Sequence, residues 1–219
     1  MHSVMLQDVR ITDAWLDNVD ISCGMGRLVV NGVDVSGYVR DELDRRYPER
    51  RKLRATTAEG LRDAWRIIGE MADATLARAR TLLEEKLNER VGGEWSYIET
   101  LRHLVFATDR WITGPVLHEA EPYDRLGIPN DDPEPWRDTI DVDARPTLDE
   151  VLAVRRGRMA SVTALLEGST TDALHRTVDS PNGGTTSVMG CVYVVLGEEW
   201  SHNRYANRDL DALGATASS

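Results

Sequence analysis

Apolar residues recur at intervals of three and four in four segments of the chain, and this spacing predicts four long α-helices. The segments are Thr57 to Leu83, Ser96 to Val116, Thr147 to Leu166, and about Ser187 to Leu213. Thr57 can cap the first helix, while Ser96 and Thr147 each have a glutamate three residues later, the pattern of a capping box. We therefore expect an all-α fold, a four-helix bundle over residues 55–213.

Residues 119–145 lack any such periodicity and hold four prolines, Pro122, Pro129, Pro133 and Pro135. A connection of this length inside a compact domain is usually functional. We expect a long crossover loop that either shapes the entrance to a site or simply joins two ends of the bundle.

The first 40 residues follow a different period. Large apolar residues recur every five positions, and smaller ones precede the last three of them by two: Leu6, Ile11, Leu16 and Ile21, with Val9, Ala14 and Val19. This is the pattern of a pentapeptide-repeat β-coil, in which both sets point inward, although a few irregular strands would fit as well. We expect residues 1–40 to form a small β-rich N-terminal appendage packed on the bundle.

Composition excludes several classes of function. The formal net charge is −11, which argues against a nucleic-acid partner, because phosphate binding needs a basic patch. No apolar run approaches the roughly 20 residues of a membrane span, and the start lacks the pattern of a signal peptide. The two cysteines, Cys23 and Cys191, lie in separate segments, so a disulfide framework is not expected. A cytoplasmic protein fits these features.

The last predicted helix carries the most informative pattern. The face that begins with the apolar residues Val188, Cys191 and Val195 continues with Glu198 and His202. A carboxylate and an imidazole four residues apart point the same way, and burying both is costly unless a partner such as a metal ion compensates. The alternative is a surface pair on a solvated helix end.

His103, on the second predicted helix, is the third candidate ligand. It stands on a face of small residues, so it is either a hydrogen-bonded core residue or a ligand. If the second and fourth helices are neighbours, His103, Glu198 and His202 converge. Two imidazoles and a carboxylate suit zinc, and also nickel or iron, and three protein ligands leave a position open as in catalytic sites.

Glu199 offers a competing hypothesis, because Glu199-x-x-His202 is half of a di-iron carboxylate site. The other half would need Glu99 and His103, which are four apart rather than three. Glu99 is better explained as the acid of the capping box. Glu199 is therefore the weaker ligand candidate.

Three stretches resemble the DinB-like superfamily of metal-binding four-helix bundles: GEWSYIETLRHLVFATDRW, ARPTLDEVLAVRRGRM and GEEWSHNRYANRDL. The usual site of that superfamily has three histidines, and here Glu198 replaces one of them. The set is similar to that of the mycothiol-dependent maleylpyruvate isomerases, whose N-terminal domain shares the fold. The pentapeptide-like start also recurs in some members. The resemblance implies that His103, Glu198 and His202 bind a divalent metal, most often zinc.

The resemblance also implies an activity. Better-studied relatives are thiol S-transferases or isomerases that use the metal to activate a low-molecular-weight thiol such as mycothiol, which attacks a small electrophile. A metal-dependent hydrolase with the same ligands is one alternative. A non-catalytic metal-binding or assembly module, with the β-rich arm as its contact surface, is another. We expect a small-molecule substrate and a homodimer, because bundles of this type often pair through helix faces. The sequence assigns no catalytic residue beyond the ligands.

Overall fold

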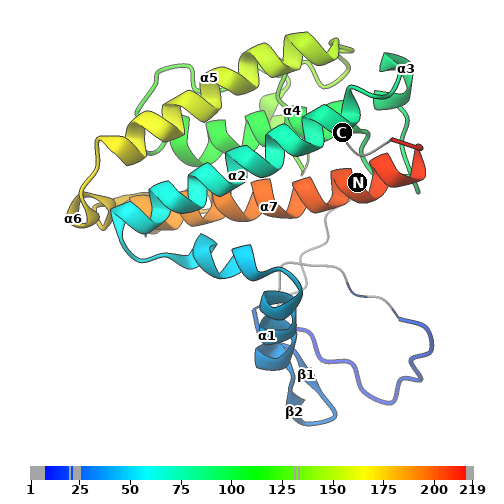
Figure 1. The fold of residues 1–219 in the computed structure, drawn as a ribbon. Coiled ribbons are helices and arrows are strands. Elements are labelled where there is room, and N and C mark those ends of the chain that lie inside the picture. The colour runs from blue at the N-terminus through cyan, green and yellow to red at the C-terminus, as the bar shows by residue number, and fades with distance from the viewer. Residues whose placement is uncertain (1–7, 20, 22–25, 131, 133, 216–219) are drawn as a thin grey trace.

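The computed structural model describes residues 8–19, 21, 26–130, 132 and 134–215 (Figure 1). The described part is mostly helical, as predicted, with two small hairpins, of which only the N-terminal one was expected. The α-helices are α1 Ser36–Arg46, α2 Ala58–Ala79, α3 Glu84–Leu87, α4 Tyr97–Thr108, α5 Leu148–Glu167, α6 Thr171–Leu174 and α7 Val188–Ala212. Shorter turns are the 3₁₀ segments η1 Pro48–Arg54 and η3 Glu134–Trp136 and the π-helical η2 Asp109–Thr113. The strands are β1 Val29–Val30, β2 Val33–Asp34, β3 Thr177–Asp179 and β4 Thr185–Ser187.

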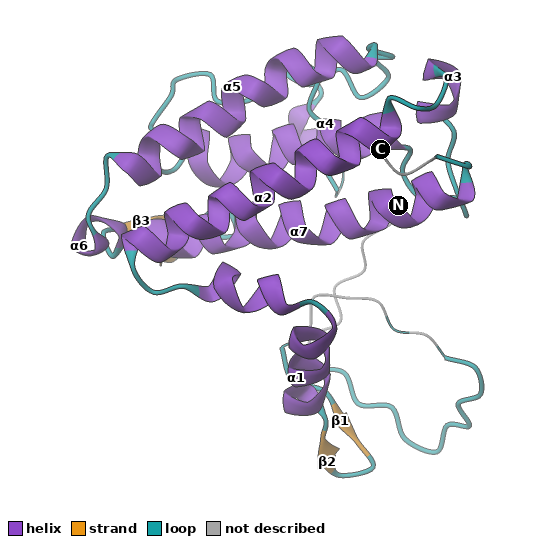
Figure 2. Ribbon diagram, viewed as in Figure 1, coloured by secondary structure: helices purple, strands orange, loops and turns teal. Residues whose placement is uncertain are grey.

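The four long helices α2, α4, α5 and α7 form the predicted bundle (Figure 2). Contacts join α2 to α7, α7 to α4, α4 to α5 and α5 to α2, so α4 and α7 are neighbours. The starts of these helices follow their caps: Thr57 accepts a hydrogen bond from the Gly60 N–H, and both predicted capping boxes are formed. The ends differ, since α2 stops at Ala79 and α4 passes into the π-helical η2.

Two apolar clusters fill the bundle. One contains Leu61, Ile68 and Val195, and the other contains Ile98 and Leu210. The apolar stripes that predicted the helices therefore face inward, as burial of apolar surface requires. None of the described helices is both long enough and apolar enough to cross a membrane.

The β-rich appendage is confirmed as the antiparallel pair β1–β2. Asn31 and Gly32 form its two-residue turn, and both have positive φ, 49° and 84°. An Asn-Gly pair is favoured there because both residues tolerate the left-handed region. Helix α1 and η1, which join the hairpin to the bundle, were not predicted; Tyr47, at their junction, packs edge-on against Trp200 of α7.

The five-residue period appears in the backbone of the arm. Asp8, Asp13 and Asn18 have φ of 53°, 55° and 53°, so a left-handed residue recurs every fifth position. Asp and Asn enter that region more readily than most residues. The expected inward packing was wrong for the described large residues: Ile11 and Leu16 are 69% and 65% exposed, and residues 8–19 contain no strand. Leu6 lies outside the described residues.

Candidate metal centre

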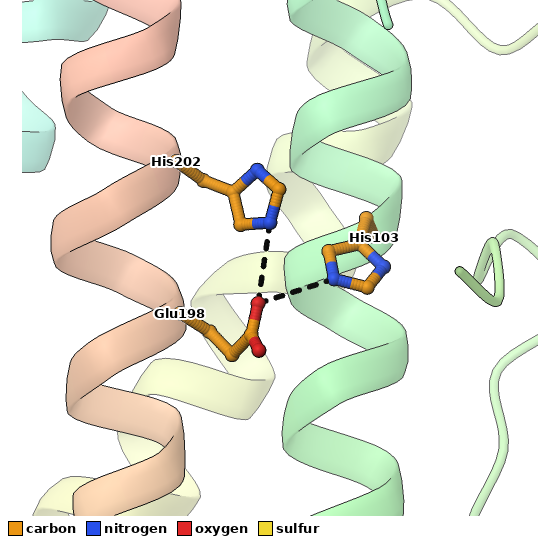
Figure 3. A group of neighbouring side chains, drawn as sticks. All are labelled: His103, Glu198 and His202. Carbon is orange, nitrogen blue, oxygen red and sulfur yellow. Dashed lines mark hydrogen bonds and ion pairs between the residues drawn. The ribbon is translucent and has the colours of Figure 1, made fainter. Parts of the chain in front are cut away.

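The three predicted ligands converge between two neighbouring helices (Figure 3). His103 comes from α4, while Glu198 and His202 come from successive turns of α7. Glu198 Oε2 lies 3.3 Å from His103 Nε2 and 3.2 Å from His202 Nε2. The three ligand atoms lie within 4.8 Å of one another. Glu198 and His202 share one face of α7, and the contact between α4 and α7 brings His103 to them.

A loop carbonyl determines how His103 faces the cluster. Its Nδ1 lies 3.1 Å from the carbonyl oxygen of Ile128. A carbonyl oxygen can only accept, so Nδ1 carries a proton, and in the neutral ring Nε2 then presents a lone pair. That lone pair faces the Glu198 carboxylate oxygen, which is also an acceptor. Two facing acceptors need a cation between them, either a second proton on the ring or a metal ion.

The carboxylate of Glu198 is kept ionised. Burial raises its pKa, but the hydrogen bonds with His103 and His202 lower the pKa by more than burial raises it. The net pKa lies well below the ordinary value for glutamate. The Glu198 side chain is 33% exposed, against 4% for His103 and 9% for His202. Glu198 therefore brings a negative charge to the cluster, and the cluster is accessible mainly from the side of Glu198.

These residues fit a divalent metal. Two imidazole nitrogens and one carboxylate oxygen are donors that zinc accepts, with bonds of about 2.0–2.2 Å. Neighbouring ligands of a tetrahedral zinc ion are then about 3.3 Å apart, which is close to the separations from Glu198 to each histidine. The hydrogen bond from His103 to the Ile128 carbonyl is the support that zinc-binding histidines usually have.

Trp95 supports the cluster, although the sequence pattern did not point to it. Its ring centroid lies 4.7 Å from that of His103 and 6.1 Å from that of His202, and the residue is buried. Packing against a rigid indole limits the rotation of both imidazoles. Its position directly before the Ser96 cap was the only signal, because nothing in periodicity separates this Trp from an ordinary core residue.

Glu199 is committed to another partner. Arg155 of α5 donates two hydrogen bonds to its carboxylate, of 2.9 and 2.8 Å, and both residues are buried. Glu99, as expected, accepts from the Ser96 N–H in the capping box, and it also pairs with Arg90. Neither glutamate belongs to the cluster with His103, so the described residues do not form the di-iron site.

A cavity of about 330 Å³ adjoins the cluster inside the bundle. All four long helices line it. Its lining includes the polar residues His202, Glu199 and Arg155 and the apolar residues Leu104 and Leu152. Tyr97 also lines it, and burial raises the pKa of Tyr97 to about 12, so its hydroxyl stays protonated at neutral pH. The cavity has room for a small organic molecule.

The 119–145 loop is anchored next to the site by a buried carboxylate. Asp109 accepts hydrogen bonds from the Asp124 N–H, 2.9 Å away, and from Arg158 of α5. Burial raises the pKa of Asp109 to about 6, despite the opposing effect of the Arg158 guanidinium. Asp109 is the first residue of the π-helical turn, so the widened end of α4 places this anchor between loop and α5.

The remaining candidates lie away from the cluster. His118 and His175 are exposed, as expected. Cys191 is fully buried, and burial raises the pKa of its thiol to about 11, so it is not a ready nucleophile. His2 and Cys23 lie outside the described residues.

Fold and cluster together define a class: a four-helix bundle whose neighbouring helices present two histidines and a glutamate suited to a divalent metal. The family model of the DinB superfamily matches residues 68–206, more than half of the chain. The chain belongs to that superfamily. No curated protein and no solved structure gave a significant match.

Proposed function

We propose that this protein is a metal-dependent thiol S-transferase of the DinB superfamily, acting on small electrophiles. The observation that carries the proposal is the partly exposed His103–Glu198–His202 cluster beside an internal cavity. A divalent metal, zinc in the first instance, would supply the Lewis acidity that lowers the pKa of a thiol at neutral pH. A low-molecular-weight thiol of the mycothiol type is the proposed cosubstrate.

The residues of the chain then have distinct roles in this proposal. His103, Glu198 and His202 hold the metal, while the Ile128 carbonyl and Trp95 keep the rings in place. The cavity next to His202 takes the apolar body of the electrophile. Holding both reactants in the right orientation in one site is a large part of how such sites accelerate reactions.

Thiol binding is the first test of this function. We expect mycothiol to shift the visible absorption spectrum of the cobalt-substituted protein, and the zinc form to consume mycothiol with at least one of a panel of electrophiles. His175→Ala, at an exposed histidine far from the cluster, should behave as the parent does. An unchanged spectrum and no thiol consumption would contradict the proposal. Ester or amide hydrolysis without thiol would favour the metal-dependent hydrolase instead.

The arm supports a separate proposal, that the chain forms a homodimer through it. Trp15 and Leu16 are 93% and 65% exposed, and apolar residues recur along the same segment. Exposed apolar patches commonly mark interaction surfaces. We expect Trp15→Ser/Leu16→Ser to shift the protein from dimer to monomer in light scattering, with metal content unchanged. Leu83→Ser, at a residue 74% exposed outside the arm, is the matched control. A parent that is monomeric, or a double variant that stays dimeric, would contradict this.

A further inference from the structure

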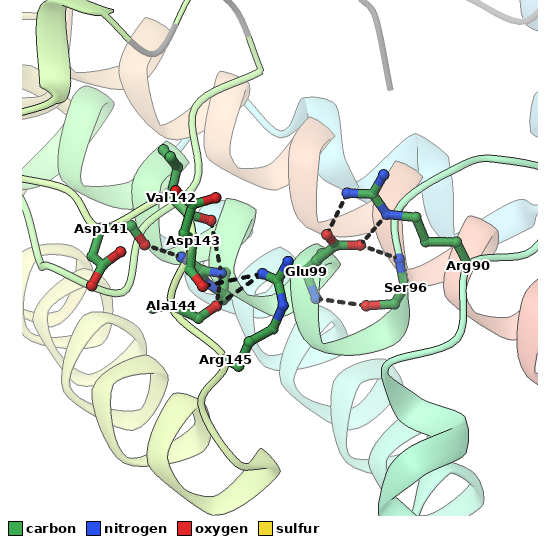
Figure 4. Close-up of polar contacts among 9 residues, drawn as sticks. Arg90, Ser96, Glu99, Asp141, Val142, Asp143, Ala144 and Arg145 are labelled. Atoms are coloured by element: carbon green, nitrogen blue, oxygen red, sulfur yellow. Dashed lines mark hydrogen bonds and ion pairs between the residues drawn. The ribbon is translucent and has the colours of Figure 1, made fainter.

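A second cavity, of about 310 Å³, lies at the start of α4 and shares no lining residue with the metal cluster. Three arginines line it, Arg90, Arg102 and Arg145, together with one acid, Glu99. Figure 4 labels Arg90, Glu99 and Arg145 in this region. The chain as a whole is strongly acidic, so an excess of two positive charges in one cavity is a local exception. Such a cavity is electrostatically suited to an anion.

Arg102 supplies a buried charge without a carboxylate in contact. The residue is 1% exposed, and its guanidinium donates to four backbone carbonyls, those of Leu126, Asp141, Val142 and Ala144. A guanidinium has five N–H groups, so one is left without an acceptor among the described residues. Backbone carbonyls satisfy hydrogen bonds but carry no net charge. A buried cation with this environment would gain from an anion nearby.

Arg145 adds a second charge that has no acidic partner in the described part of the chain. Its guanidinium makes only 3.3 Å contacts with the carbonyls of Asp143 and Ala144. It lies close enough to Arg102 that its charge lowers the pKa of that residue, after the larger effect of burial. Two like charges held side by side on the wall of a cavity repel each other unless an anion lies between them.

The one acid in the cavity is already neutralised. Glu99 receives two hydrogen bonds from Arg90, of 2.9 and 2.5 Å, and one from the Ser96 N–H. Burial and the charge of Arg145 lower the pKa of Arg102 by more than the charges of Glu99, Asp141 and Asp143 raise it, so the net pKa is lowered. The first turn of α4, capped by Ser96, adds the positive end of the helix dipole to the same wall.

We propose that this cavity, between Arg102 and Arg145, binds the oxyanion group of a small metabolite, a carboxylate or a phosphate. The fork of Arg145 can match either group with paired hydrogen bonds, and Arg102 has one further N–H to add. Neighbouring residues on a helix point about 100° apart, so Arg102 reaches this cavity while His103 reaches the metal cluster. The site does not depend on the proposed thiol chemistry.

Calorimetric titration of metal-free protein with inorganic phosphate, and separately with malonate, tests the site. Metal-free protein is used so that neither anion can bind to the metal ion. A titration with sodium chloride at equal ionic strength measures the effect of non-specific screening. We expect saturable binding of at least one anion, weakened about tenfold or more in Arg145→Gln, since a hydrogen bond to a charged group is lost. Arg145 is exposed, so its replacement should leave the fold intact.

The matched control is Arg66→Gln, which removes the same charge from an exposed α2 pair with Glu70. It should bind both anions as the parent does. Circular dichroism and the thermal midpoint of each variant establish that it is folded. Absence of saturable binding by either anion to the parent would overturn the proposal, and so would equal affinities of the parent and Arg145→Gln.

Discussion

Replacing Arg155 by methionine is expected to lower the free energy of unfolding by about 3–5 kcal/mol, the usual cost of breaking a buried ion pair from one side. The substitution leaves the Glu199 carboxylate, which is 3% exposed, without a cation between α5 and α7. Burying an unpaired charge is far more costly than losing the favourable contact itself. Urea unfolding at pH 7, with the parent and Arg155→Met compared at equal metal content, measures the difference in the free energy of unfolding.

Two further variants separate this cause from a simple loss of packing. Arg155→Met/Glu199→Leu should recover most of the lost stability, because apolar residues can replace a whole buried pair at little cost. Arg66→Met removes one member of a surface pair and should change stability by about 1 kcal/mol or less. If Arg155→Met lost no more stability than Arg66→Met, the Glu199 carboxylate would have another partner, and the assigned pairing would be wrong.

His202→Ala is expected to remove the metal. Losing one of three protein ligands should weaken binding more than the 10- to 100-fold cost that is typical for a supporting residue around a metal. Elemental analysis of protein purified without an affinity tag should find about one divalent ion per chain in the parent and almost none in the variant. His175→Ala should keep the parent's content, since that histidine is exposed.

The same measurement can refute the metal site. If the parent held no metal even after addition of zinc or nickel, His103 would instead be a core residue that hydrogen-bonds the Ile128 carbonyl and Glu198. The proposed transferase would then lose its basis. The anion cavity is tested on metal-free protein, so the result of the anion titration is independent of the result of the metal analysis.

Local interactions explain how much of the fold the sequence predicts. Capping by Thr57, Ser96 and Thr147 involves residues three positions apart, so the starts of three helices can be located within one residue. The ends are less predictable: the π-helical turn at Asp109 accompanies contacts with Arg158 and Asp124, which are distant in sequence. The exposed arm shows a further limit of prediction from sequence. Its five-residue repeat predicts the period of the backbone, but not which residues pack against it.

The candidate site divides in the same way. Glu198 and His202 were paired by helix geometry alone, since residues four apart share a face. His103 joined them through a family resemblance and the assumption that two helices are neighbours. Only the tertiary structure decided that Glu199 pairs with Arg155, that Trp95 covers both imidazoles, and that Arg102 and Arg145 share a cavity. Those contacts join segments that are distant in sequence. A local sequence pattern does not determine which distant segments pack against each other.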